Sequence, residues 1–113
     1  MLEINKDNID LFTTEVLEET EKPVFVDFWG DKCEICKQLM PGVHELADKY
    51  SDKIKFASFN ITGARRVAMA QKVLGLPTMI IYKNGERAAV ITPDKVSNIA
   101  DVENFIKEYY ETI

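Results

Sequence analysis

Apolar residues gather along this chain in short runs that predict strands. The strands are expected at residues 2–4, 24–29, 54–60, 76–82 and 86–91. Residues 24–29 and 76–82 are almost continuously apolar, which is typical of strands covered on both faces in parallel or mixed sheets. Asn84-Gly85 predicts a tight hairpin before the last strand, because both residues readily take the positive φ angles of a type I′ turn.

Apolar positions recur at helical spacing between these strands. The helices are expected over residues 9–17, 33–50, 64–73 and 99–109. Asp7 or Asn8 is placed to cap the first helix, and Gly75 to close the third. Pro41 falls inside the longest helix, where the loss of an intrahelical donor should bend the axis and set the first turn apart.

The order of these elements, β-α-β-α-β-α-β-β-α, predicts an α/β fold. A parallel half is joined to an antiparallel hairpin, so we expect a central mixed β-sheet flanked by helices on both faces. The 113 residues, 46% of them hydrophobic, suffice for one core and leave little room for a second. Residues 1–113 are therefore expected to form a single domain.

Charge and hydropathy narrow the possible partners. The chain has 14 basic and 19 acidic residues, a formal charge of -5 and no dense basic tract, which argues against binding of nucleic acid. It shows neither a basic-then-apolar leader nor an apolar run long enough to cross a membrane. We expect an acidic globular protein of the cytoplasm with no membrane partner.

The two cysteines, Cys33 and Cys36, are the candidate chemistry of the chain. They follow the strand at 24–29 after a short polar turn and lie at the head of the longest predicted helix. Their spacing suits a reversible intramolecular disulfide, since neighbours one helical turn apart can reach disulfide geometry. In a reducing compartment such a bridge is usually catalytic or redox-sensing rather than a permanent staple.

The predicted helix assigns different roles to the two sulfurs. Unpaired N–H groups and the dipole at a helix N-terminus favour ionisation of Cys33, which is therefore the expected nucleophile. Cys36 lies one turn further in and would resolve a mixed disulfide. Lys32 should favour the Cys33 thiolate and Glu34 should oppose it, so the net effect of the two charges stays open.

Half of a zinc site is the alternative explanation of the two cysteines. Structural zinc usually takes four Cys or His ligands, and the chain offers only two cysteines and one histidine, His44. A site within one chain is thereby disfavoured, whereas zinc shared between two chains stays open. We expect His44 to be a partly exposed helix residue, and we expect no bound metal.

The chain resembles the thioredoxin family over nearly its whole length. The motifs that carry the resemblance are Val26-Asp27-Phe28-Trp29, Cys33, Cys36, Lys37, Pro41, Asn60-Ile61, Gly75-Leu76-Pro77-Thr78 and Tyr82-Lys83-Asn84-Gly85-Glu86. The resemblance implies a thioredoxin fold and a monomeric protein-disulfide reductase. Its redox-active Cys33–Cys36 disulfide would take the place of a cofactor. Its partners would be disulfide-containing target proteins and a thioredoxin-reductase-like flavoprotein that reduces it.

The resemblance also implies roles for residues around the cysteines. The Leu76–Pro77 bond should be cis and lie against the disulfide, with the Leu76 backbone pairing to a bound substrate chain. Trp29 would shield the disulfide and contact partners, or simply pack at the strand end. Asp27 matches the family's buried acid, which exchanges a proton with Cys36, and burial would raise its pKa. A structurally hydrogen-bonded Asp27 is the alternative.

Several positions depart from the usual family pattern. Glu34-Ile35 replaces the usual Gly-Pro between the cysteines, Lys32 replaces a Trp, and Ser58 replaces the Lys that neighbours the buried acid. Residues 92–94 lack the family's glycine in a loop that borders the substrate groove. Without the Lys, we predict an Asp27 pKa at least as high as in ordinary family members.

The unusual dipeptide, together with residues 64–68 and 71–78, resembles the thioredoxins paired with glycine, sarcosine or betaine reductases in amino-acid-fermenting anaerobic bacteria. That resemblance implies a dedicated electron donor, reduced by an NAD(P)H-dependent flavin reductase and reoxidised by a selenoprotein reductase system. Arg65-Arg66 is interpreted as a solvated helix start, with a docking patch as the alternative. The competing function for the whole chain is a non-catalytic thioredoxin-like binding or stabilising subunit.

Overall fold

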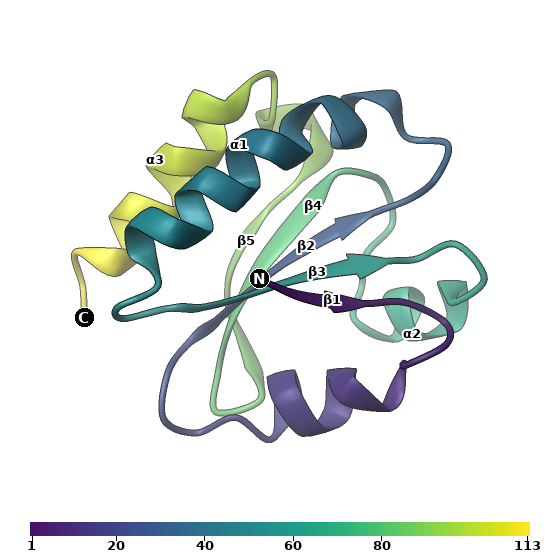
Figure 1. Ribbon diagram of the computed structural model, residues 1–113, viewed down its shortest axis with the longest axis horizontal. Helices are drawn as coiled ribbons and strands as arrows, with labels where there is room; N and C mark the ends of the chain where they lie inside the picture. The colour runs from purple at the N-terminus through teal and green to yellow at the C-terminus, as the bar shows by residue number, and fades with distance from the viewer.

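Five strands form one mixed sheet in the computed structural model, which describes residues 1–113 (Figure 1). They are β1 Leu2–Ile4, β2 Val24–Trp29, β3 Lys55–Asn60, β4 Thr78–Lys83 and β5 Glu86–Ile91. The order across the sheet is β1-β3-β2-β4-β5. Strands β1, β3 and β2 are parallel to one another, and β4 is antiparallel to both of its neighbours, β2 and β5. The predicted α/β fold is confirmed, and β2 lies at the centre of the sheet.

Helices cover both faces of the sheet and close a separate core on each (Figure 1). The helices are η1 Phe12–Leu17, α1 Glu34–Tyr50, α2 Arg65–Ala70, the short η2 Pro93–Lys95 and α3 Ile99–Tyr110. Side chains of α1 and α3 pack with Phe25 of β2 on one face. Side chains of η1 and α2 pack with Val26 and Phe28 on the other. None of these helices is both long and apolar enough to cross a membrane.

The hairpin between β4 and β5 forms as its sequence predicts. Asn84 and Gly85 have φ angles of 53° and 80°, the positive values that a type I′ turn requires. A Cβ added to Gly85 would lie 2.6 Å from the carbonyl oxygen of Leu17, at the end of η1. Glycine is therefore required here both by the backbone angle and by the close approach of η1.

The first helix differs from its prediction. Residues 12–17 are π-helical, and the Glu18 N–H donates to the carbonyl of Thr13 at 2.9 Å. Neither Asp7 nor Asn8 caps the helix, because the Asn8 side-chain oxygen accepts the N–H of Asn5 at 2.7 Å instead. The predicted cap is wrong because a local turn competes for the same side chain.

The end of α2 also differs, since Gly75 does not close it. Lys72 takes the left-handed conformation there, with a φ angle of 63°. The N–H of Lys72 donates to the carbonyl of Met69, and the N–H of Val73 donates to the carbonyl of Ala68. These two hydrogen bonds form the Schellman motif. The helix therefore ends at Ala70, five residues before the glycine. The longest helix, α1, continues through Pro41 from Glu34 to Tyr50, so the first turn with the cysteines and the rest of the helix form one element.

Candidate active site

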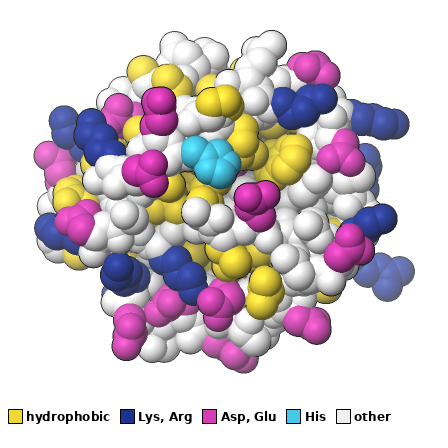
Figure 2. Space-filling model, viewed as in Figure 1, with side chains coloured by type: hydrophobic (Ala, Val, Ile, Leu, Met, Phe, Trp, Pro, Cys, Tyr) yellow, Lys and Arg dark blue, Asp and Glu magenta, His cyan; other side chains and the backbone are white.

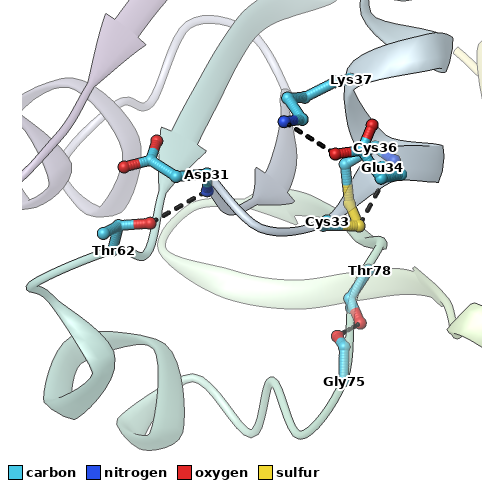
Figure 3. Close-up of a disulfide and its surroundings, with 8 residues drawn as sticks. All are labelled: Asp31, Cys33, Glu34, Cys36, Lys37, Thr62, Gly75 and Thr78. Carbon is cyan, nitrogen blue, oxygen red and sulfur yellow. Dashed lines mark hydrogen bonds and ion pairs between the residues drawn. A yellow bond between two sulfur atoms is a disulfide. The ribbon is translucent and has the colours of Figure 1, made fainter.

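Cys33 and Cys36 are joined by a disulfide at the start of α1 (Figure 3). Their Cα atoms are 5.3 Å apart, and Cys33 is the N-cap of the helix. The Cys36 N–H donates to Cys33 Sγ at 3.3 Å. A backbone donor that has no partner within the helix therefore already points at this sulfur. Cys33 is partly exposed, whereas Cys36 is 1% exposed. The outer sulfur alone is open to a partner.

The charged side chains around the disulfide oppose a Cys33 thiolate less than the sequence alone indicates. Lys32 is exposed directly before Cys33. The Glu34 carboxylate forms an ion pair with Lys37 Nζ at 3.1 Å (Figure 3). This pair partly offsets the negative charge expected to oppose a Cys33 thiolate, although both side chains are exposed and the effect is small.

The turn that leads to the cysteines is held against the loop after β3 by hydrogen bonds. The Cys33 N–H donates to the Gly30 carbonyl at 3.0 Å, which closes the turn. The Asp31 N–H donates to Thr62 Oγ1 at 3.0 Å (Figure 3). The Asn60 amide donates to Asp31 Oδ1 at 2.8 Å. Sequence reasoning missed this connection. The available signal was short polar residues following two adjacent parallel strands.

Asp27 is buried in the middle of β2, on the face that α1 covers. Side chains alternate along a strand, so Asp27 shares this face with Phe25, which packs against α1. Ser58 and Met79 flank it on the two neighbouring strands. The side chain is 1% exposed and its Oδ1 has no hydrogen-bond partner in the protein. These contacts oppose the alternative of a structurally hydrogen-bonded Asp27.

Burial raises the pKa of Asp27 from 3.8 to about 7, because the surrounding apolar groups disfavour the charged carboxylate. No cation is present to counter this effect, since Ser58 stands on the adjacent strand at the position directly opposite. The direction agrees with the prediction made from the sequence. A carboxyl group with this pKa can gain or lose a proton near neutral pH.

The Leu76–Pro77 peptide bond is cis, as the resemblance implied. Pro77 is buried, and Leu76 reaches the cysteine turn, since a Cβ added to Gly30 would lie 3.1 Å from Leu76 Cδ1. The Thr78 hydroxyl donates to the Gly75 carbonyl at 2.6 Å and fixes the loop just before β4 (Figure 3). The backbone N–H and C=O of Leu76 take no part in the protein's backbone hydrogen bonds.

Cys33 and Leu76 line one cleft of about 550 Å³. We call it the cysteine cleft. Trp29 is partly buried at the end of β2 and does not line this cleft, and its indole N–H has no partner within the protein. Pro93 lies against Gly75, 3.2 Å from where a Cβ would stand, so the loop after β5 approaches the segment just before Leu76.

The remaining candidate residues, apart from Arg65, do not line the cysteine cleft. His44 is exposed on α1, in keeping with its expected place on the helix surface. No group of three or more His, Cys, Asp or Glu side chains is placed to hold a metal ion. Arg65 and Arg66 are exposed at the start of α2, and only Arg65 lines the cysteine cleft.

Comparison with known proteins gives matches along almost the entire chain. The family profile described as Thioredoxin matches residues 1–108. The thioredoxin of Acetoanaerobium sticklandii is 43% identical over 109 residues, which are 96% of this chain and 99% of that protein. The thioredoxin of Peptoclostridium acidaminophilum is 49% identical over 94 residues, 83% of this chain and 82% of that protein. Both cysteines lie inside the matched region.

Asp27→Asn should stabilise the protein at high pH and have little effect near pH 4. Between pH 3.8 and about 7 the unfolded chain has released a proton that the folded protein still holds. The stability of the natural protein relative to the variant therefore falls as pH rises through this window, by up to about 4 kcal/mol, and then levels off. Urea unfolding of the oxidised protein at a series of pH values measures this difference.

Asp48→Asn is the matched control, because Asp48 is exposed on α1. Its stability difference from the natural protein should not change between pH 4 and pH 8.5. If the Asp27→Asn difference is equally flat, the carboxyl group is not protonated in the folded protein at pH 5 to 6.

Proposed function

Because the chain belongs to the thioredoxin family, we propose how its residues divide the work of disulfide exchange. The protein is a thiol–disulfide oxidoreductase that reduces protein disulfides, and its redox-active group is the Cys33–Cys36 pair. The proposal rests chiefly on the unequal burial of the two sulfurs at the N-terminus of α1. We assign attack to Cys33 and resolution to Cys36.

In the first step, the Cys33 thiolate attacks one sulfur of a target disulfide. A mixed disulfide forms between Cys33 and the target, and the other target sulfur leaves as a thiolate that takes up a proton. The partial exposure of Cys33 allows the target sulfur to approach. The N–H groups at the start of α1 favour negative charge at this position.

In the second step, Cys36 attacks the Cys33 sulfur of the mixed disulfide. The bond to the target breaks, the second target sulfur leaves and is protonated, and the Cys33–Cys36 disulfide is restored. Cys36 must first lose its proton, and we assign its acceptance to Asp27. The position of Asp27 on the α1 face and its raised pKa of about 7 support this role.

We propose that a target chain lies over Leu76 and Pro77 in the cysteine cleft. The free backbone groups of Leu76 can pair with an extended target segment, as when a strand is added to an edge. Trp29 is assigned to shielding the sulfurs and contacting the partner from the strand end of the turn.

The finer physiological role that we propose is dedicated electron donation to a glycine-reductase-type system. A thioredoxin-reductase-like flavoprotein using NAD(P)H would reduce the protein, and a selenoprotein reductase system would reoxidise it. The proposal is based on the Glu34-Ile35 dipeptide and the segments 64–68 and 71–78. We further propose that the protein acts as a single-domain monomer in the cytoplasm.

Cys33→Ser should abolish the acceleration of insulin-disulfide reduction by dithiothreitol, leaving only the rate without protein. Cys36→Ser should still attack but should accumulate a mixed disulfide, because the resolving sulfur is missing. Turbidity measures the reduction, and mass spectrometry under non-reducing conditions detects the trapped species. The same acceleration from Cys33→Ser and the natural protein, or none from either, would support the non-catalytic binding role instead.

Replacing Glu34-Ile35 by Gly-Pro should separate the dedicated role from general disulfide reduction. We expect the double variant to keep its insulin activity but to lose about tenfold in kcat/KM with a purified glycine reductase, or about 1.4 kcal/mol of transition-state stabilisation. Glycine-dependent oxidation of NAD(P)H, with the flavin reductase present, measures the coupling. If the natural protein reduces insulin but supports no such oxidation, the dedicated role is wrong and general reduction stands.

A further inference from the structure

Asn84 differs from the other asparagines of the chain in both its neighbour and its surroundings. The chain contains six asparagines, and Asn84 is the only one followed by glycine. It is exposed in the turn between β4 and β5. The side chains of four others are held by hydrogen bonds within the protein, namely Asn5, Asn8, Asn60 and Asn98. The Asn84 amide is therefore the one most open to chemical attack.

The Gly85 backbone nitrogen is the nucleophile that lies closest along the chain. Asparagine is chemically labile, because the nitrogen of the following residue can attack its side-chain carbonyl carbon. Glycine favours this attack, since it has no Cβ to crowd the nitrogen. The N–H of Gly85 takes no part in the protein's backbone hydrogen bonds. The turn thus pairs an exposed amide with a nitrogen that no backbone acceptor holds.

The reaction requires the turn to open, because the five-membered ring that it forms fixes the Asn84 backbone outside the left-handed region. In the closed turn Asn84 is left-handed, with a φ angle of 53°. Strand β5 lies at the edge of the sheet beside β4 alone, and residues 86–88 are exposed. The tip of the hairpin can therefore open locally while the core stays closed.

The turn lies at the end of the sheet away from the disulfide. Tyr82, near the end of β4, pairs with Val24 at the start of β2, whereas Thr78 pairs with Phe28 close to the cysteine turn. Figure 1 shows the turn beside η1, far from the start of α1. Figure 2 shows charged side chains of both signs in the lower left part of the molecule, where Figure 1 places this turn. Water is therefore at hand for a hydrolysis there.

We propose that Asn84 deamidates spontaneously, and that the isoaspartyl product loosens the β4–β5 hairpin from η1. The Gly85 nitrogen bonds to Asn84 Cγ, the bond from Cγ to the amide nitrogen breaks, and ammonia leaves with the proton of the Gly85 N–H. Water then opens the resulting succinimide ring. Cleavage at Cγ gives aspartate, and cleavage at the main-chain carbonyl gives isoaspartate, in which the backbone runs through the side chain. Each product carries a carboxylate in place of the amide.

The two products should differ in their effect on the hairpin. Isoaspartate adds a methylene group to the backbone, for which a two-residue type I′ turn has no place. Gly85 cannot shift towards η1, because a Cβ there would already lie 2.6 Å from the Leu17 carbonyl oxygen. Leu17 packs against the core that contains Phe12 and Tyr82. The isoaspartyl form should thus be less stable, whereas aspartate keeps the turn, since Asp-Gly also suits type I′.

The first test follows the oxidised full-length protein during incubation at mildly alkaline pH. Peptide mapping by mass spectrometry locates each gain of one dalton. Asn84 should be converted while the other five asparagines stay intact, and unfolding in urea should accelerate its conversion because the turn is then always open. Earlier conversion of another asparagine would overturn the proposal. So would an intact Asn84 in the folded protein after the urea-unfolded chain has been fully converted.

Two variants locate the reaction. Asn84→Gly removes the amide but keeps a residue that readily takes a positive φ angle, so the variant should show no early gain in mass. Asn104→Gln is the matched control, because Asn104 is exposed on α3 and is followed by Phe105. It should gain mass at the rate of the natural protein. An equally fast gain in Asn84→Gly would contradict the assignment to Asn84.

The second test separates the added backbone atom from the added charge. Asn84→Asp supplies the aspartyl product directly, and chromatography isolates the isoaspartyl form from the incubated protein. The isoaspartyl form should unfold at about 0.5 M less urea than Asn84→Asp. Both should reduce insulin disulfides at the natural rate, because the turn is remote from Cys33. Equal unfolding midpoints would overturn the effect on the hairpin, and lost activity in the folded isoaspartyl form would contradict its separation from the disulfide site.

Discussion

The buried carboxyl group of Asp27 is energetically unfavourable in the fold, and the proposed active site is arranged around it. It lies in the middle of the central strand, on the face that packs against α1, with one oxygen unpaired and with the uncharged residues Ser58 and Met79 at the paired positions of the neighbouring strands. Stability alone would favour an apolar or neutral side chain at this position. A buried, unpaired acid on the sheet face that packs against α1 suits the proton transfer that we propose for disulfide exchange.

The rest of the site follows from the way β2 ends. The strand carries Asp27 on its α1 face, and the turn after it makes Cys33 the N-cap of α1 and buries Cys36 one turn later. Two neighbouring segments hold this turn in place. The loop after β3 binds it through Thr62, and the segment before β4 lays Leu76 over Gly30. Both segments also line the cysteine cleft, so the residues that position the sulfur also shape the cleft beside it.

The sequence predicted the elements whose signals are local. Continuous apolar strands, the Asn84-Gly85 turn, the amphipathic last helix and the placement of Cys33 are all readable from neighbouring residues. The predictions of the helix ends were wrong where a residue other than the expected one, or a different hydrogen-bond partner, ended the helix. Asn8 turned back to the chain near β1 instead of capping η1, and Lys72 ended α2 although Gly75 was available. Propensity ranks residue types, but tertiary context decides which one is used.

Features built from distant segments were out of reach. The Asp31–Thr62 bond depends on two loops meeting at one edge of the sheet. The 89% exposure of Leu74, an apolar residue directly after the buried Val73, is likewise decided by how distant segments pack. The most direct test of the site is a titration of Asp27 by carboxyl-carbon NMR in the oxidised protein. A pKa near 7, lowered in Ser58→Lys by the new neighbouring charge, is predicted; a pKa near 3.8 would contradict a buried, proton-accepting Asp27.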